Sequence, residues 1–121
     1  METDTASAAL VSGAAMRAAV ADTLGLIAGN ADLAERERRV PDENIEALRA
    51  TGIFRSLQPA RYGGTPMGAE DYTPALVELA GACASTAWVT GLLAQHAHMI
   101  ALMSAELQDE VWGDDPDALA S

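Results

Sequence analysis

The fold is decided by the stretch ALVELAGACASTAWVTGLLAQHAHMIALM, residues 75–103. Alanine and leucine supply most of its apolar surface, and both favour helix over sheet. Polar residues interrupt the stretch, so its apolar runs are far shorter than the ~20 residues that cross a membrane. Helices this apolar normally lie inside a larger structure. The stretch therefore predicts two helices buried in protein, one over residues 71–84 and one over residues 85–103.

Apolar residues before this stretch also recur at helical spacing. Between residues 6 and 34, spacings of three and four place one group on a single helical face: Met16, Val20, Leu24, Ile27 and Ala31. A short second helix is predicted to begin at Pro41 or Asp42, because the residue before a proline is disfavoured in a helix. This second helix turns Ile45 and Leu48 inward.

Turn and cap residues mark the ends of the predicted helices. Gly52 stands where a left-handed backbone is expected after the second helix. Gln58–Gly68 is rich in glycine and proline, so it is predicted to be a loop. Polar caps are predicted for the last three helices: Asp71, then Ser85 or Thr86, then Ser104. The sequence predicts about five helices and no convincing strand, so the fold class is all-α.

Length and charge narrow the class of protein. The 121 residues fit a single domain over 1–121. Eighteen acidic residues against seven arginines give a formal net charge of −11, which makes nucleic acid or an anionic membrane a poor partner. Cys83 is the single cysteine and is predicted to be a small core residue. Without a basic export signal near its start, the chain is predicted to be cytoplasmic.

Side chains that could carry chemistry gather in the fourth predicted helix. Trp88 and His96 lie about two turns and about 80° apart, within reach of one cavity. An indole can stack on a planar ligand while an imidazole exchanges a hydrogen bond with it. His98 diverges from His96 by about 160°, so the two cannot share a metal, and no metal site is predicted. A plainer interpretation stays open, in which Trp88 is a core residue and His96 a satisfied buried histidine.

Five segments carry a resemblance to a known family: RVPDE (39–43), GIFRSLQP (52–59), RYGG (61–64), ACASTAWV (82–89) and EVWGDDP (110–116). Through them, the chain from about residue 31 onward resembles the amino-terminal helical domain of the acyl-CoA dehydrogenase fold. The STAW block followed by VWG resembles, more narrowly, the oxygenase components of two-component aromatic and polyketide hydroxylases. The YGG loop is shared with the dehydrogenases.

The resemblance implies one part of a larger enzyme, without its β domain and carboxy-terminal helical bundle. That enzyme would be a flavin-dependent monooxygenase that takes reduced FMN or FADH2 from a separate flavin reductase. It would use dioxygen to hydroxylate a small aromatic substrate, and it would be a homo-oligomer, usually a tetramer. By the resemblance, Trp88 borders substrate and flavin, and His96 hydrogen-bonds near the activated oxygen or the substrate oxygen. His98 is the weaker candidate, and the 121-residue chain alone is expected to be inactive.

Two other functions stay open at this point. The chain could be the amino-terminal domain of an acyl-CoA dehydrogenase, in which FAD and a carboxylate base on another segment abstract the α-proton. It could also be a non-catalytic, truncated helical interaction module. Turnover of a phenol or of an acyl-CoA separates the two enzymes, and flavin titration separates both from a non-catalytic module.

Overall fold

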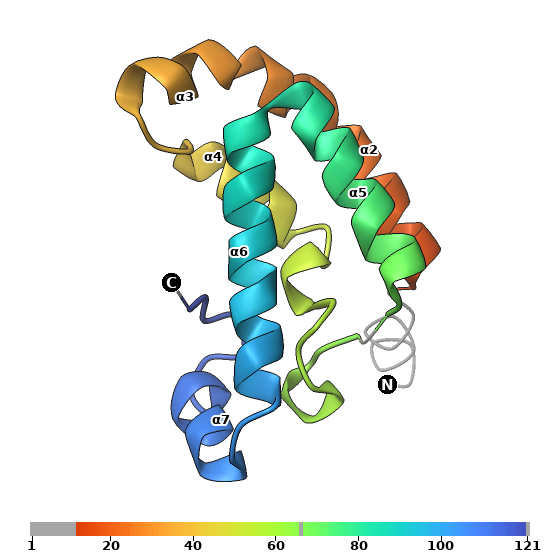
Figure 1. Ribbon diagram of the computed structural model, residues 1–121, viewed down its shortest axis with the longest axis vertical. Helices are drawn as coiled ribbons and strands as arrows, with labels where there is room; N and C mark the ends of the chain where they lie inside the picture. Colours follow the sequence, from red (N-terminus) through yellow and green to blue (C-terminus); the bar gives the residue numbers. More distant parts are fainter. Residues whose placement is uncertain (1–11, 66, 121) are drawn as a thin grey trace, which may run out of the picture.

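Six α-helices and two short 3-10 turns make up the described part of the computed structural model, residues 12–65 and 67–120 (Figure 1). In chain order these are α2 (Gly13–Gly29), α3 (Ala31–Glu37), α4 (Asp42–Arg49), η1 (Ile53–Arg55), η2 (Ala60–Tyr62), α5 (Ala69–Ala82), α6 (Ala84–Ala101) and α7 (Ala105–Trp112). Those residues contain no strand, so the all-α prediction is confirmed. No helix among them is both long and apolar enough to span a membrane.

Asn30 divides the predicted first helix into α2 and α3, which is why the count exceeds the predicted five. Its side-chain Nδ2 donates to Glu43 Oε1 and to Asn44 Oδ1, each at 2.9 Å. The Asn30 backbone, with φ −95° and ψ 4°, departs from helical values at this junction. The predicted start of the first helix near residue 6 lies outside the described residues. Within them, Ser12 caps α2, and its Oγ accepts from the Ala15 N–H at 3.1 Å.

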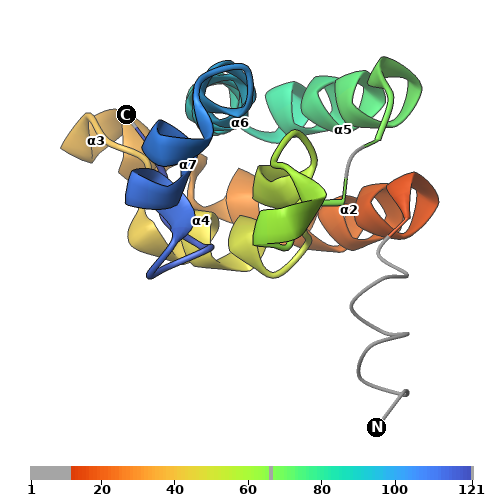
Figure 2. The ribbon, with the colours of Figure 1, turned by 90° about the horizontal axis from the view of Figure 1, so that it is seen from below.

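The helices form two layers, which are seen edge-on in Figure 2: α5 and α6 lie side by side, with α2 and α4 beneath them. Fully buried side chains fill the space between the layers: Met16, Val20, Ile27, Leu48, Ile53, Ala75 and Leu79. Cys83 lies in the same core, which confirms its prediction as a small core residue. Leu24 and Ala31, which belong to the predicted stripe, only pack against the edge of this core.

Two of the predicted helix caps are wrong, and both helices begin earlier than predicted. Helix α5 starts at Ala69, so Asp71 lies in its first turn, where a carboxylate still favours the positive end of the helix dipole. Helix α6 starts at Ala84, with Cys83 in the cap position. The cap prediction for Ser104 is confirmed, because its Oγ accepts from the Leu107 N–H at 3.2 Å.

Thr86, predicted as a possible cap, is instead a buried contact between helices. It lies inside α6 with none of its surface exposed, and its Oγ1 accepts from Asn44 Nδ2 at 3.1 Å. Asn44 is equally buried, and its Oδ1 accepts from Asn30. A buried polar group costs free energy unless it is hydrogen-bonded, so these three side chains favour one arrangement of α2, α4 and α6.

Two glycines allow a direct test of the packing. A Cβ on Gly64 would lie 1.8 Å from the Gln58 carbonyl oxygen, whereas a Cβ on Gly25 would meet nothing within 4 Å. We expect Gly64→Ala to lower the free energy of unfolding by about 1–3 kcal/mol or more, because a backbone atom must move. Gly25→Ala, in the middle of α2, should raise it by up to about 1 kcal/mol. Urea unfolding of both variants measures the difference, and equal effects would contradict the packing of the Gly64 loop.

Candidate functional site

Helix α6 presents an uncharged apolar face to solvent. Residues 84–101 contain no Asp, Glu, Lys or Arg, in a chain whose formal net charge is −11. Trp88 is 70% exposed, and Met99 and Leu102 are 51% and 75% exposed. The interpretation of Trp88 as a core residue is therefore wrong for this chain. Large apolar side chains gathered on one face mark a surface that another molecule or segment contacts.

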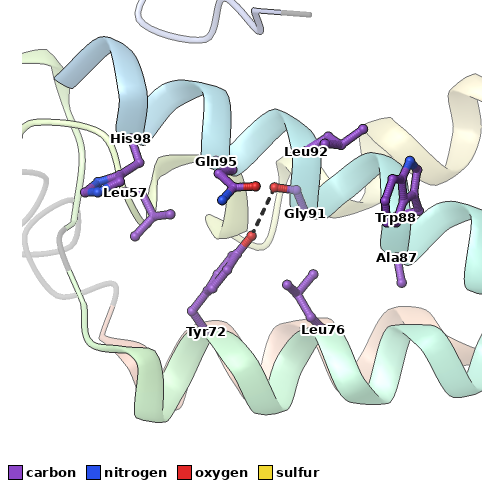
Figure 3. Close-up of a pocket in the computed structure, with 9 residues that line it drawn as sticks. All are labelled: Leu57, Tyr72, Leu76, Ala87, Trp88, Gly91, Leu92, Gln95 and His98. Atoms are coloured by element: carbon purple, nitrogen blue, oxygen red, sulfur yellow. Dashed lines mark hydrogen bonds between the residues drawn. The ribbon is translucent and has the colours of Figure 1, made fainter. Parts of the chain in front are cut away.

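A groove of about 440 Å³ lies between α5 and α6 and is bordered by this face (Figure 3). Its lining is mostly apolar: Leu57, Tyr72, Leu76, Ala87, Trp88, Gly91, Leu92, Gln95 and His98. Figure 3 places Trp88 at one end of the groove and His98 beside Leu57 at the other. An apolar groove with a few polar groups is the usual form of a site for a small organic ligand.

Tyr72 contributes a hydroxyl to the lining of this groove, and the hydroxyl donates to the Gly91 carbonyl oxygen at 3.4 Å. Burial raises the pKa of the Tyr72 phenol above its ordinary value, because the charged form is poorly solvated there. The folded pKa therefore lies above the unfolded one. The stability that the neutral Tyr72 phenol contributes is fully present below the pKa of the unfolded chain. This stability is lost as the pH rises through the pKa of the folded chain. At neutral pH the hydroxyl is an uncharged donor.

The two histidines face different surroundings. His98 lines the groove that Trp88 borders, although the sequence analysis ranked it as the weaker candidate. His96 is half-buried and lies outside the lining of that groove, beside the segment that follows α7. On a helix each histidine stands about 80° from Trp88, in opposite directions, so spacing alone could not separate them. The structure brings Trp88 together with His98, and the role of His96 stays a prediction.

A hydrogen bond to the main chain orients the His96 ring. Its Nδ1 lies 3.0 Å from the Ala120 carbonyl oxygen. A carbonyl oxygen only accepts, so Nδ1 carries the proton in this bond. In the neutral ring the other nitrogen, Nε2, is then an acceptor with a free lone pair. His96 is thereby arranged to accept a proton at Nε2.

A second groove, of about 620 Å³, lies on the other side of Trp88. The end of α3, the following turn and the start of α6 line it: Ala34, Glu35, Arg38, Arg39, Val40, Ala84, Ser85, Trp88 and Val89. Arg38 has a left-handed backbone with φ 56°, and Arg39 Nη2 pairs with Asp42 Oδ1 at 2.7 Å. This groove therefore holds two guanidinium groups beside two carboxylates, those of Glu35 in its lining and of Asp42 paired with Arg39. Trp88 borders both grooves.

Two contributors to the site were missed by the sequence analysis. Tyr72 stands four residues before Leu76, so helical spacing placed both on one face and could have identified it. The Ala120 carbonyl gave no signal, because a backbone contact across 24 positions leaves no pattern in side-chain types. Among the described residues, no group of three or more His, Cys, Asp or Glu side chains could hold a metal ion.

These features define a class: a two-layer helical domain whose exposed aromatic residue borders an apolar groove. Residues 12–114 match the family model described as the acyl-CoA dehydrogenase N-terminal domain. The chain therefore belongs to the acyl-CoA dehydrogenase N-terminal domain family, as its sequence motifs predicted.

Several relatives are oxygenase components. The chain is 51% identical to the p-hydroxyphenylacetate 3-hydroxylase oxygenase component of Acinetobacter baumannii, over 92% of this chain and 26% of that protein. It is 42% identical to the FADH(2)-dependent resorcinol hydroxylase oxygenase component of Rhizobium sp., over 79% of this chain and 25% of that protein. The crystal structure of the HsaA monooxygenase from Mycobacterium tuberculosis superposes with a TM-score of 0.87 at 35% identity, covering 89% of this chain and 28% of that one. The chain thus spans about a quarter of the length of the relatives it matches.

Proposed function

We propose that this chain is one part of a flavin-dependent monooxygenase that hydroxylates a small aromatic substrate. The proposal rests on the 51% identity to an oxygenase component. The observation that carries it in the structure is the exposed indole of Trp88 at the edge of an apolar groove. Aromatic rings stack well on such a surface, and an apolar wall excludes water from the reaction.

The described residues fit one wall of a flavin site. A planar ring system can lie against Trp88, since the indole is 70% exposed. When bound, reduced FMN or FADH2 supplies the two electrons with which dioxygen is activated for transfer of one oxygen atom. A flavin reductase, as the words "oxygenase component" in the relatives' names indicate, would deliver the reduced flavin.

His96 is proposed as the catalytic residue, and Trp88 as the residue that borders substrate and flavin. Nε2 of His96 accepts the proton of a phenolic hydroxyl, which raises electron density on the ring that receives the oxygen atom. The Nδ1 bond to Ala120 supports this role, because it leaves the lone pair on Nε2. In this proposal the complete protein is a cytoplasmic homo-oligomer, and residues 1–121 form one helical domain of it.

An acyl-CoA dehydrogenase is the second candidate, because the matching family model is named for that enzyme. Its proton-abstracting carboxylate would come from another segment. The relatives named above favour the monooxygenase, since both are hydroxylases by name.

The proposal predicts hydroxylation that depends on reduced flavin. We expect the complete protein that carries this segment to convert a phenol to a catechol with a flavin reductase, NADH and dioxygen. Isotopically labelled dioxygen should place one labelled oxygen atom in the product. The 121-residue chain alone should form no product. Oxidation of an acyl-CoA with an electron acceptor, without oxygen incorporation, would establish the dehydrogenase instead.

A further inference from the structure

The segment after α7 is attached to the body of the domain by three side chains from another region. We call these three the clamp: Arg49, Arg55 and Gln58. Asp117 accepts three hydrogen bonds: its main-chain oxygen accepts from Arg49 Nη1 at 2.6 Å, and its Oδ1 accepts from Arg55 Nη2 at 2.5 Å and from Arg55 Nε at 3.1 Å. Gln58 Nε2 donates to the Pro116 carbonyl oxygen at 2.7 Å. Charged donors make such bonds stronger than neutral ones.

The clamp also fixes the glycine loop beside this segment. Arg55 Nη1 donates to the Gly63 carbonyl oxygen at 3.2 Å, and Gln58 Nε2 donates to the Tyr62 carbonyl oxygen at 2.9 Å. Arg55 and Gln58 each join the loop to the segment after α7. Gln58 is only 3% exposed, so its amide is a buried donor to two carbonyl oxygens at once.

The clamped segment leads directly to the carbonyl that orients His96. Only Ala118 and Leu119 lie between Asp117 and Ala120, and Leu119 packs against the core. The position of the Ala120 oxygen therefore depends on where the clamp holds residues 116 and 117. His96 Nδ1 keeps its hydrogen bond of 3.0 Å only while that oxygen stays in place.

We propose that the clamp, Gln58 and Arg55 above all, selects the tautomer of His96. With the Ala120 oxygen held, the proton stays on Nδ1 and the lone pair on Nε2. When the clamp is broken the carbonyl moves, and the ring is free to place its proton on Nε2. Gln58 and Arg55 are positioning residues, since neither is bonded to the imidazole. The consequence for hydroxylation rests on the function proposed above, whereas the tautomer itself does not.

Nitrogen NMR of the imidazoles in the 121-residue chain tests the clamp, because it distinguishes a protonated Nδ1 from a protonated Nε2. The measurement is made at about pH 8, above the ordinary titration range of histidine. His98, the other histidine, serves as the reference within the same molecule. We expect His96 in the unmodified chain to be protonated on Nδ1.

Gln58→Glu is the sharpest variant, because it keeps the shape and replaces a double donor by a carboxylate facing two carbonyl oxygens. We expect the Nδ1-protonated fraction of His96 to fall to below about half in this variant. Gln108→Glu is the matched control: Gln108 is 8% exposed, and its Nε2 donates to the Ala101 and Met103 carbonyl oxygens, both at 3.0 Å. Gln108 Oε1 also accepts from Arg61 Nη2 at 2.9 Å, and a glutamate keeps that acceptor. Gln108→Glu therefore changes the junction of α6 and α7 but none of the clamp's own hydrogen bonds, so His96 should keep its tautomer.

Arg55→Met is the second variant and gives a result even where Gln58→Glu does not fold. The Arg55 side chain is 33% exposed, so its loss should leave the fold intact while removing the bonds to Asp117 and Gly63. We expect a shift of the His96 tautomer in the same direction. Arg39→Gln, which breaks the exposed pair with Asp42 and leaves the clamp intact, should cause no shift.

An unchanged His96 tautomer in Arg55→Met, or in a folded Gln58→Glu, would overturn the proposal. Equal shifts in Gln58→Glu and Gln108→Glu would also overturn it, because they would indicate a general loosening rather than the clamp. None of these outcomes depends on flavin or on a substrate. Failure of the hydroxylation assay would therefore contradict the proposed function without touching this inference.

Discussion

We expect His96→Ala in the complete enzyme to lower hydroxylation by about 10²-fold or more while reduced flavin still binds. Loss of one well-placed catalytic hydrogen bond raises the barrier by about 3 kcal/mol. Hydrogen peroxide release should rise at the same time, because oxygen that is reduced but not transferred to the ring leaves as peroxide. Product formation and peroxide release, measured against NADH consumed, give both quantities in one assay.

His98→Ala is the matched control two residues away on α6. Its ring lies in the groove between α5 and α6 and does not face the Ala120 carbonyl. We therefore expect a much smaller loss of hydroxylation and little uncoupling. Should both variants couple oxygen to product equally well, His96 is a structural residue whose Nδ1 bond only attaches the segment after α7.

The largest effect on stability is expected at Trp112, which is 1% exposed. Its ring centroid lies 5.5 Å from that of Tyr62, with the planes tilted by 44°. Trp112→Ala should lower the free energy of unfolding by about 3–5 kcal/mol, because it leaves a cavity and removes an aromatic pair. Trp88→Ala should lower it by less than about 1 kcal/mol, since surface substitutions have small effects.

Urea unfolding followed by circular dichroism measures both tryptophan variants. Trp112→Phe provides a milder change if Trp112→Ala is unfolded without denaturant. Equal destabilisation by the two alanine variants would contradict the placement of Trp112 inside and Trp88 outside.

The sequence predicted the elements better than their junctions. Stripes with periods of three and four identified the helices around Met16 and Leu48, because periodicity follows from one buried face. Asn30 was not recognised as an interruption, since its partners Glu43 and Asn44 lie on a later helix. A polar residue near the start of a helix can be a cap or a buried contact, and its residue type alone does not decide between them. Thr86 fits a cap by type, but a partner in α4 places it inside the helix and in the core.

The candidate site shows the same division. Trp88 and the two histidines were identified from residue type and spacing, which are local properties. Residue type and spacing could not identify the histidine that shares the groove with Trp88, because each histidine stands about 80° from Trp88 on the helix. That choice depends on the side on which α5 packs, and α5 brings Tyr72 to the side of His98.

By itself the sequence determined that this chain is an all-α member of its family, that Cys83 is buried and that Ser104 caps α7. Periodicity, capping and motif residues are encoded within one or two turns, so the order of residues alone carries them. The tertiary structure decided that Trp88 is exposed and that His96 donates to Ala120. Exposure and backbone hydrogen bonds depend on segments far apart in the chain, which come together only when the two layers pack.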